Sequence, residues 1–237
     1  MKKLKMLLLA DLHYIGVADH VCKIPSRKGN IALELIDKIM KSLESTDIDL
    51  IVLLGDLVDN GNADGAKEDI IQIRERLLEY GIDVLVVPGN HDGPKDEMLN
   101  IFNNHQGLHK IHGYQIMTFA DLYDEKDNAT RDFDIMEEAF LGADKDKPII
   151  VFQHNPIYPK IDREYPYNLG DADKIMEYYT EHNVLFSISG HAHWGIPLAK
   201  YDNVGYITCP ALCEEPHRYT VLTLKGHKYN IKEGSVL

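Results

Sequence analysis

The sequence predicts an α/β fold built on a largely parallel β-sheet, and two observations lead to this prediction. Short, uninterrupted apolar runs recur along the chain, and runs of this length are typical of strands that are buried on both faces. Segments with helical periodicity separate them, and an alternation of strands with helices favours parallel pairing. The apolar runs lie within residues 5–13, 49–59, 83–92, 148–156 and 184–193.

Four helices are expected between these strands. Asn30 is a candidate cap for the first helix, which carries an apolar stripe with a period of 3.6 residues. The second helix contains the apolar positions of residues 70–78 and ends before Gly81, a typical C-terminal stop. Residues 131–141 show a weaker helical pattern, and Asp171 is a candidate cap for the fourth helix. The stripe of the first helix consists of Ile31, Leu35, Ile36, Ile39, Met40 and Leu43.

The C-terminal segment shows strand patterns without helices. Residues 206–212 form one apolar run, and residues 218–233 alternate around Lys225–Gly226–His227, which resembles a hairpin turn. No internal repeat or linker is evident, so we expect a single domain over residues 1–237.

Charge and composition limit the class of protein. The formal net charge of the 237 residues is −13, which argues against non-specific binding to nucleic acid or an anionic membrane, because both require a basic face. The apolar run Met6–Ala10 is shorter than the roughly 7–15 residues of a signal-peptide core. No segment approaches the roughly 20 apolar residues of a membrane span.

The three cysteines suggest the setting in which the protein works. They are Cys22, Cys209 and Cys213, and no two have the CxxC spacing. An odd number of cysteines in a chain of this size favours a reducing environment, so we expect a cytoplasmic protein. Cys209 and Cys213 match the spacings of known zinc sites poorly.

Polar residues with metal-ligating side chains follow all five predicted strands. Ligands of open α/β sheets bind beyond the carboxyl ends of the strands, so we expect these side chains to meet at one edge. Carboxylates, an amide oxygen and imidazoles suit Mn, Fe or Zn better than Ca or Mg alone. The set exceeds the roughly four to six ligands of one ion, so two ions are indicated. Its members are Asp11, His13, Asp56, Asp59, Asn90, His91, Asp92, His154, His191 and His193.

Some of these residues also have purely structural interpretations. Asp92 could cap a helix that starts at Pro94, and Asn90 could be only a turn residue. Trp194 follows the last histidine pair and is expected to form part of a wall rather than to stack on a substrate. A polar stretch contains three further histidines that we expect to be solvated, namely His105, His109 and His112.

The motifs DLH, GDLVD, GNHD, QHNP and GHAH follow one another in this order between residues 11 and 193. This series resembles the calcineurin-like metallophosphoesterases. The resemblance implies a four-layer α-β-β-α sandwich of two mixed sheets, with a dimetal site at the carboxyl ends of the strands and the C-terminal strands in a second sheet. It divides seven ligands between two ions that Asp56 bridges: Asp11, His13 and His193 for one ion, and Asn90, His154 and His191 for the other.

The resemblance also implies a mechanism. Two metal ions about 3.5–4 Å apart supply a hydroxide that attacks phosphorus in line. His91 would protonate the leaving group as general acid, and Asp92 would orient the His91 ring. Asp59 would contact a ligand or stabilise a turn rather than bind metal.

The substrate is the least constrained feature. Residues 14–29 and 155–170 could shape the pocket, with Arg27 and Arg163 as candidate substrate-binding residues, although a proline-braced surface loop is an alternative for the second segment. We favour a small-molecule phosphodiester as the substrate. A phosphomonoesterase, a nuclease and a non-catalytic metal-binding scaffold are alternatives. A nucleic-acid partner is not expected, and the sequence does not indicate an oligomeric state.

Overall fold

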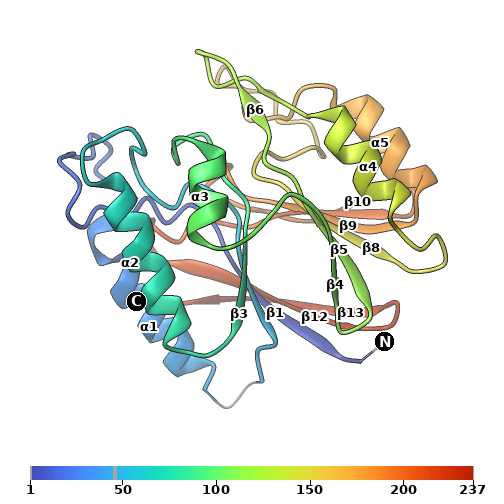
Figure 1. Ribbon diagram of the computed structural model, residues 1–237, viewed down its shortest axis with the longest axis horizontal. Coiled ribbons are helices and arrows are strands. Elements are labelled where there is room, and N and C mark those ends of the chain that lie inside the picture. Colours follow the sequence, from blue (N-terminus) through green and yellow to red (C-terminus); the bar gives the residue numbers. More distant parts are fainter. Residues whose placement is uncertain (1, 45–46, 237) are drawn as a thin grey trace.

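Two large β-sheets lie face to face in the computed structural model, which describes residues 2–44 and 47–236 (Figure 1). The first sheet contains β1 (Leu4–Leu9), β2 (Leu50–Leu53), β3 (Asp83–Val86), β12 (Arg218–Lys225) and β13 (Lys228–Ser235), in the order β13-β12-β1-β2-β3. The second contains β4 (Gly107–Ile111), β5 (Tyr114–Thr118), β8 (Ile149–Phe152), β9 (Val184–Ser189), β10 (Ile196–Tyr201) and β11 (Val204–Thr208), in the order β10-β11-β9-β8-β5-β4. A short hairpin joins β6 (Leu122–Tyr123) to β7 (Ala129–Thr130).

Helices cover the outer face of each sheet. The helices α1 (Ala32–Ser42), α2 (Ala66–Leu78) and α3 (Lys95–Ile101) lie against the first sheet. The helices α4 (Phe133–Leu141) and α5 (Ala172–Glu181) lie against the second. The architecture is therefore the four-layer sandwich that the resemblance implied. Within residues 2–44 and 47–236, none of the helices combines the length and the apolar character needed to cross a membrane.

Apolar side chains fill the space between all four layers. In β1, Leu7 and Leu9 belong to the core under α1 and α2, whereas Met6 and Leu8 belong to the core between the sheets. Alternate side chains of a strand point to opposite faces, and all four of these side chains are fully buried. Burial on both faces explains why the strands appear in the sequence as uninterrupted apolar runs.

The loops that follow the parallel strands meet at one edge of the sandwich. The amide of Asp11 donates to the carbonyl of Gly55 (3.1 Å), which connects the ends of β1 and β2. In the second sheet, the amide of Gly190 donates to the carbonyl of His154 (3.0 Å). The amide of His191 then reaches the carboxylate of Asp11 at 3.1 Å and connects the two sheets. The polar strand ends of both sheets are therefore neighbours.

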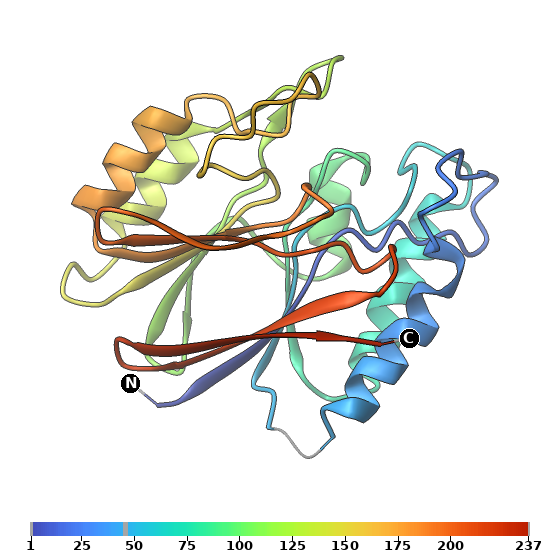
Figure 2. The same cartoon turned by 180° about the vertical axis from the view of Figure 1, so that it is seen from behind.

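The C-terminal strands divide between the two sheets, as Figure 2 shows from behind. The strands β10 and β11 extend the second sheet, and β11 is parallel to β9. The strands β12 and β13 complete the first sheet, where β12 is antiparallel to β1. The expectation that the C-terminal strands lie in a second sheet is correct for β11 but wrong for β12 and β13, which belong to the first sheet. Each sheet has parallel strands and, at one edge or both, antiparallel strands.

Three local expectations need correction, although all four expected helices are confirmed. Asn30 does not cap α1, because it lies inside a 3₁₀ turn (Gly29–Ile31) and Ile31 takes the capping position. Asp171 takes the capping position of α5, but its side chain makes no capping hydrogen bond. The hairpin β4–β5 was not expected. It half-buries His109, which was expected to be solvated, and His109 Nε2 lies 3.0 Å from Thr118 Oγ1.

Candidate metal centre

The candidate ligands that follow the strands occupy unusually tight turns. Positive φ angles occur at Asp11 (53°), His13 (45°), Asp56 (52°) and His191 (67°). Residues other than glycine adopt this region rarely and at a cost of about 1–3 kcal/mol. Such conformations concentrate at functional sites. The sharp change of direction at the end of each strand turns these side chains toward one another.

One group of side chains gathers around the end of β1. The Nε2 atoms of His13 and His193 lie 3.3 Å apart. Asp11 Oδ1 is 3.5 Å from His193 Nε2, and Asp56 Oδ2 is 3.6 Å from His13 Nε2. The first three predicted ligands are therefore together, with one oxygen of Asp56 beside them.

A second group gathers around the other oxygen of Asp56. Asp56 Oδ1 is 3.4 Å from His154 Nε2, which lies 3.1 Å from His191 Nδ1. The buried Nε2 of His191 has no hydrogen-bond partner among the described residues. Asn90 belongs to the adjacent turn, where the neighbouring amide of His91 donates to Asp56 Oδ1 (2.9 Å). The structure thus places Asp56 between two clusters of imidazoles.

The orientation of the Asn90 side chain is set from outside these clusters. Its Nδ2 donates to the hydroxyl of Tyr165 (3.4 Å), which donates in turn to Asp127 Oδ2 (3.0 Å). The amide oxygen of Asn90 is buried and has no hydrogen-bond partner in the described part of the chain. An amide oxygen left in this way is available to a cation.

Hydrogen bonds outside the clusters also fix two of the histidine rings. His193 Nδ1 donates to Glu214 Oε1 (3.1 Å), and His154 Nδ1 donates to the carbonyl of Leu54 (2.6 Å). Carboxylates and carbonyls only accept hydrogen bonds, so each Nδ1 carries a proton. In the neutral ring, Nε2 then presents a lone pair toward the site, which is the usual arrangement of a metal-ligating histidine.

The buried carboxylates create a strong demand for positive charge. Burial lowers the pKa of His154, but Asp56 and Asp11 overcome this effect and raise the pKa to about 10. Burial likewise lowers the pKa of His193, but Asp11 raises it to about 9. Without metal, a proton on each Nε2 lies between the ring and a carboxylate oxygen; a bound metal cation would take the place of that proton. The residues present therefore fit a metal centre.

Asp92 does not orient the His91 ring, so this expectation is wrong. Asp92 Oδ1 accepts from the amides of Leu57 (2.6 Å) and Val58 (3.2 Å), and Oδ2 accepts from the amide of Gly89 (2.7 Å). Burial and the charge of Asp56 raise the pKa of Asp92 to about 6. Asp92 neither caps a helix nor contacts His91; it holds together the two loops that carry Asp56 and Asn90.

The His91 ring is held instead by the backbone of Asp59. His91 Nδ1 donates to the Asp59 carbonyl (2.6 Å). The other ring nitrogen, Nε2, takes no part in this hydrogen bond. The ring of His91 meets that of His13 edge to face, with 4.7 Å between centroids. His91 is half-buried and lines a pocket beside both clusters.

The Asp59 carboxylate contacts three further side chains. Its Oδ1 lies 3.1 Å from His13 Nδ1 and accepts from Arg27 Nη1 (3.0 Å). Its Oδ2 lies 2.8 Å from His20 Nε2. Arg27, expected to bind substrate, is thus paired with Asp59, although it still lines the pocket.

The pocket above the clusters has a volume of about 570 Å³ and an aromatic wall. The guanidinium of Arg163 lies 4.0 Å from the centroid of the Trp194 ring. Tyr167 meets Trp194 edge to face, with 5.0 Å between ring centroids. Trp194 is therefore a wall residue, and Arg163 reaches the pocket by stacking on it. The lining consists of Ile24, Arg27, Asp56, His91, Asp127, Arg163, Tyr165, Tyr167, His191, His193, Trp194 and Glu214.

The sequence did not predict that Tyr165 contacts Asn90, that Glu214 contacts His193 or that His20 contacts Asp59. Each lies on a loop without a repeating pattern, and its partner is far away in the sequence. Glu214 is one of many acidic residues in this chain and lies more than 20 residues after His193, so no local pattern pointed to it.

Comparisons with known proteins identify the family. The family model of the calcineurin-like phosphoesterases matches residues 4–195. Two curated relatives bear the name "Probable cyclic nucleotide phosphodiesterase". The one from Synechococcus sp. is 24% identical over 194 residues, 78% of this chain and 71% of the relative. The one from Vesicomyosocius okutanii is 23% identical over 202 residues, 80% of this chain and 82% of the relative.

Solved structures agree on the fold. A dimetal phosphatase from Danio rerio superposes with a TM-score of 0.79 at 15% identity, over 99% of both chains. A protein from Thermus thermophilus superposes with a TM-score of 0.68 at 18% identity, over 100% of both chains. Because the family model covers most of the sequence, this chain belongs to the calcineurin-like phosphoesterase family and is a metal-dependent hydrolase of phosphoesters.

Proposed function

We propose that this protein hydrolyses a small-molecule phosphodiester with two transition-metal ions bound at the candidate metal centre. The position of Asp56 carries the proposal, because its two oxygens face two separate imidazole clusters. Mn, Fe or Zn suit the mixture of carboxylate, amide and imidazole donors. Free cysteines support a cytoplasmic setting. The residues that would hold the ions are Asp11, His13, Asp56, Asn90, His154, His191 and His193.

Other side chains would have separate roles in the proposed reaction. When bound, a pair of metal ions supplies a nucleophile at neutral pH and compensates charge on the phosphate oxygens. The departing alkoxide needs a proton, which His91 Nε2 would donate as general acid, since Nδ1 is already bonded to the Asp59 carbonyl. The aromatic wall of Tyr165, Tyr167 and Trp194 would hold the organic part of the substrate.

Charge supports a diester rather than a monoester. A phosphomonoester dianion brings about one more negative charge than a diester, and the chain already carries a net charge of −13. Of the two arginines of the pocket, Arg27 has its charge paired with Asp59, whereas Arg163 stacks on Trp194 and keeps its charge. A diester needs less compensation beyond the metal ions. The names of the two curated relatives point to cyclic nucleotides as the first diesters to test.

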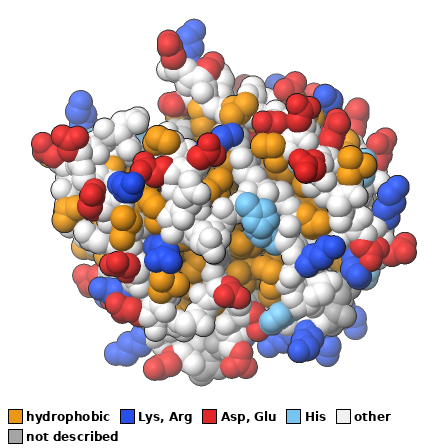
Figure 3. All heavy atoms as spheres, in the orientation of Figure 1, with side chains coloured by type: hydrophobic (Ala, Val, Ile, Leu, Met, Phe, Trp, Pro, Cys, Tyr) orange, Lys and Arg blue, Asp and Glu red, His pale blue; other side chains and the backbone are white. Residues whose placement is uncertain are grey.

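The nuclease and scaffold alternatives are less well supported. Figure 3 shows a face on which acidic and basic side chains alternate without a continuous basic stripe, and a nuclease needs such a stripe to follow a phosphate backbone. A scaffold would be expected to lose ligands or the general acid. All seven proposed ligands and His91 are present in this chain.

The substrate class is tested by comparing kcat/KM for bis(p-nitrophenyl) phosphate and p-nitrophenyl phosphate at one pH and one metal loading. We expect the diester to be hydrolysed at least as efficiently as the monoester. Cyclic nucleotides form the third arm of the panel. A preference for the monoester of more than about tenfold, or about 1.4 kcal/mol in transition-state stabilisation, would identify a phosphatase instead.

The contact between Glu214 and His193 leads to a separate prediction about metal affinity. Glu214→Ala removes the acceptor for His193 Nδ1, and loss of such a partner typically weakens metal binding by about 10–100-fold. Glu214→Gln keeps an acceptor oxygen and should weaken binding less. The exposed neighbour Glu215 gives a matched control, Glu215→Ala. Equal metal affinities of Glu214→Ala and Glu215→Ala, measured by competition with a chelator, would show that Glu214 has no such role.

A further inference from the structure

We propose that Cys213 is an additional, thiolate ligand of the ion held by Asp11, His13 and His193. This inference rests on the proposed function, because it assigns one more donor to one of the two metal sites. It departs from the sequence-based expectation of a ligand set without sulfur.

The position of Cys213 is fixed by backbone pairing. Ala211 forms a parallel bridge with Ala10. The amide of Leu212 donates to the Ala10 carbonyl (2.9 Å), and the amide of Cys213 donates to the Asp11 carbonyl (3.2 Å). The segment after β11 therefore runs beside the end of β1 in a defined register. This register places Cys213 next to the first ligand of the site.

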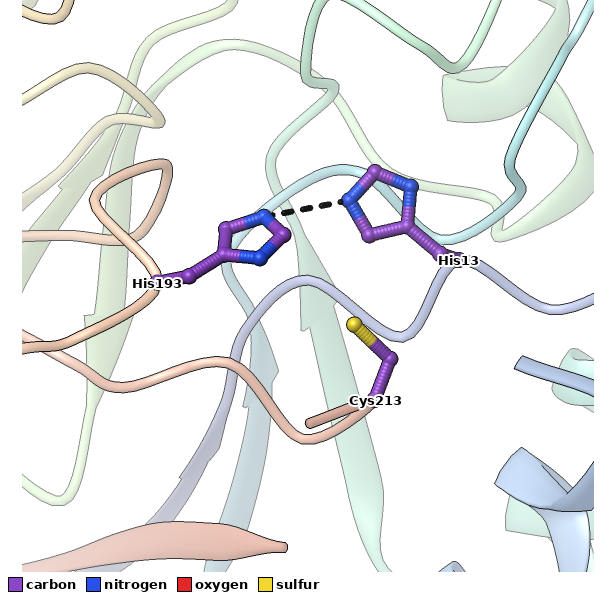
Figure 4. A group of neighbouring side chains, drawn as sticks. All are labelled: His13, His193 and Cys213. Carbon is purple, nitrogen blue, oxygen red and sulfur yellow. Dashed lines mark hydrogen bonds between the residues drawn. The ribbon is translucent and has the colours of Figure 1, made fainter. Parts of the chain in front are cut away.

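The thiol of Cys213 lies with the two imidazoles. Ligand atoms of His13, His193 and Cys213 are all within 4.8 Å of one another, and Figure 4 shows the sulfur below the gap between the two rings. Cys213 is fully buried and forms no disulfide. In the described part of the chain, its sulfur has no hydrogen-bond partner. It is therefore a buried donor aimed at a site rather than a member of another network.

The distances suit a shared ion. Metal–sulfur bonds of about 2.3 Å and metal–nitrogen bonds of about 2.0–2.1 Å allow two ligand atoms of one ion to be up to about 4.4 Å apart. A contraction of a few tenths of an ångström brings the whole group within that reach. On binding, the S–H bond breaks, the metal–sulfur bond forms, and the proton leaves to solvent. Sulfur would make this site softer than its partner, which favours Zn²⁺ or Co²⁺ over Mn²⁺.

Cobalt substitution tests the assignment, because a cobalt–thiolate bond gives a charge-transfer band in the near ultraviolet. We expect the Co²⁺-reconstituted protein to show this band, Cys209→Ser to keep it, and Cys213→Ser to lose it while still binding two cobalt ions. Cys209 is a fair control, since it is equally buried and lies outside the group of ligand atoms.

Cobalt K-edge absorption of the unmodified protein provides a measurement that does not depend on how the variant folds. One sulfur neighbour at about 2.3 Å would support the proposal. Two bound cobalt ions with only nitrogen and oxygen neighbours would overturn it and leave the proposed function intact. A protein that binds none of Co²⁺, Zn²⁺ and Mn²⁺ would overturn both.

Discussion

Asp56→Asn is expected to weaken metal binding at both sites of the dinuclear centre and to cause a large loss of activity. Asparagine is neutral and offers one oxygen, whereas Asp56 directs one oxygen toward His13 and the other toward His154. Metal ions contribute several kcal/mol of charge stabilisation to phosphoester hydrolysis. Each 1.36 kcal/mol corresponds to a factor of ten in rate, so hydrolysis should fall by roughly 10³-fold or more. Metal analysis should show weakened binding at both sites.

Asp64→Asn is the matched control, because Asp64 is exposed and lies on the loop after β2. It should keep the metal content and the rate of the unmodified protein. The thermal unfolding of both apo variants separates a loss of metal from a loss of structure. If the folded Asp56→Asn protein retained two tightly bound ions, Asp56 would not be the bridging ligand.

His91→Ala should leave both metal ions in place and lower turnover by about 10²–10⁴-fold on substrates with poor leaving groups, the usual contribution of a general acid. The ring faces the pocket, and its Nδ1 is bonded to the Asp59 carbonyl, which leaves Nε2 for the substrate. The loss should shrink for nitrophenyl esters, because their leaving groups depart with little protonation.

The measurement is kcat for an alkyl phosphodiester and for bis(p-nitrophenyl) phosphate, each at known metal content. His227→Ala serves as the control, since His227 is exposed between β12 and β13. Equal losses on the two substrates would mean that His91 acts in some way other than proton donation. Loss of metal from His91→Ala would assign the residue to the ligand set.

The central strands and the clustering of the predicted metal ligands could be predicted from the sequence, because both follow from local patterns. An apolar run identifies a strand buried on both faces, and its carboxyl end then determines where Asp11, Asp56 and His154 lie. The division of the C-terminal strands was not predictable in this way, since it depends on pairing between β1 and β12, which are more than 200 residues apart.

The residues that contact the predicted metal ligands were predicted less well, because such contacts also depend on pairing between distant parts of the chain. Asp92 follows His91 directly in the sequence, yet its carboxylate turns away to three backbone amides. Asp59 was expected to contact a ligand and lies beside His13, whereas Glu214, which reaches His193 from a loop, was not expected. Cys213 reaches it through the bridge between Ala10 and Ala211. Such contacts depend on tertiary register, which no local pattern of a single sequence encodes.

The proposed function requires two metal ions at this site for phosphodiester hydrolysis. Metal-free protein is titrated with Zn²⁺, and bound metal and hydrolysis of bis(p-nitrophenyl) phosphate are measured on the same samples. We predict no activity in the metal-free protein and a maximum when two ions are bound per chain. Activity that persists without metal, or that is complete with a single bound ion, would rule out a mechanism that uses two metal ions.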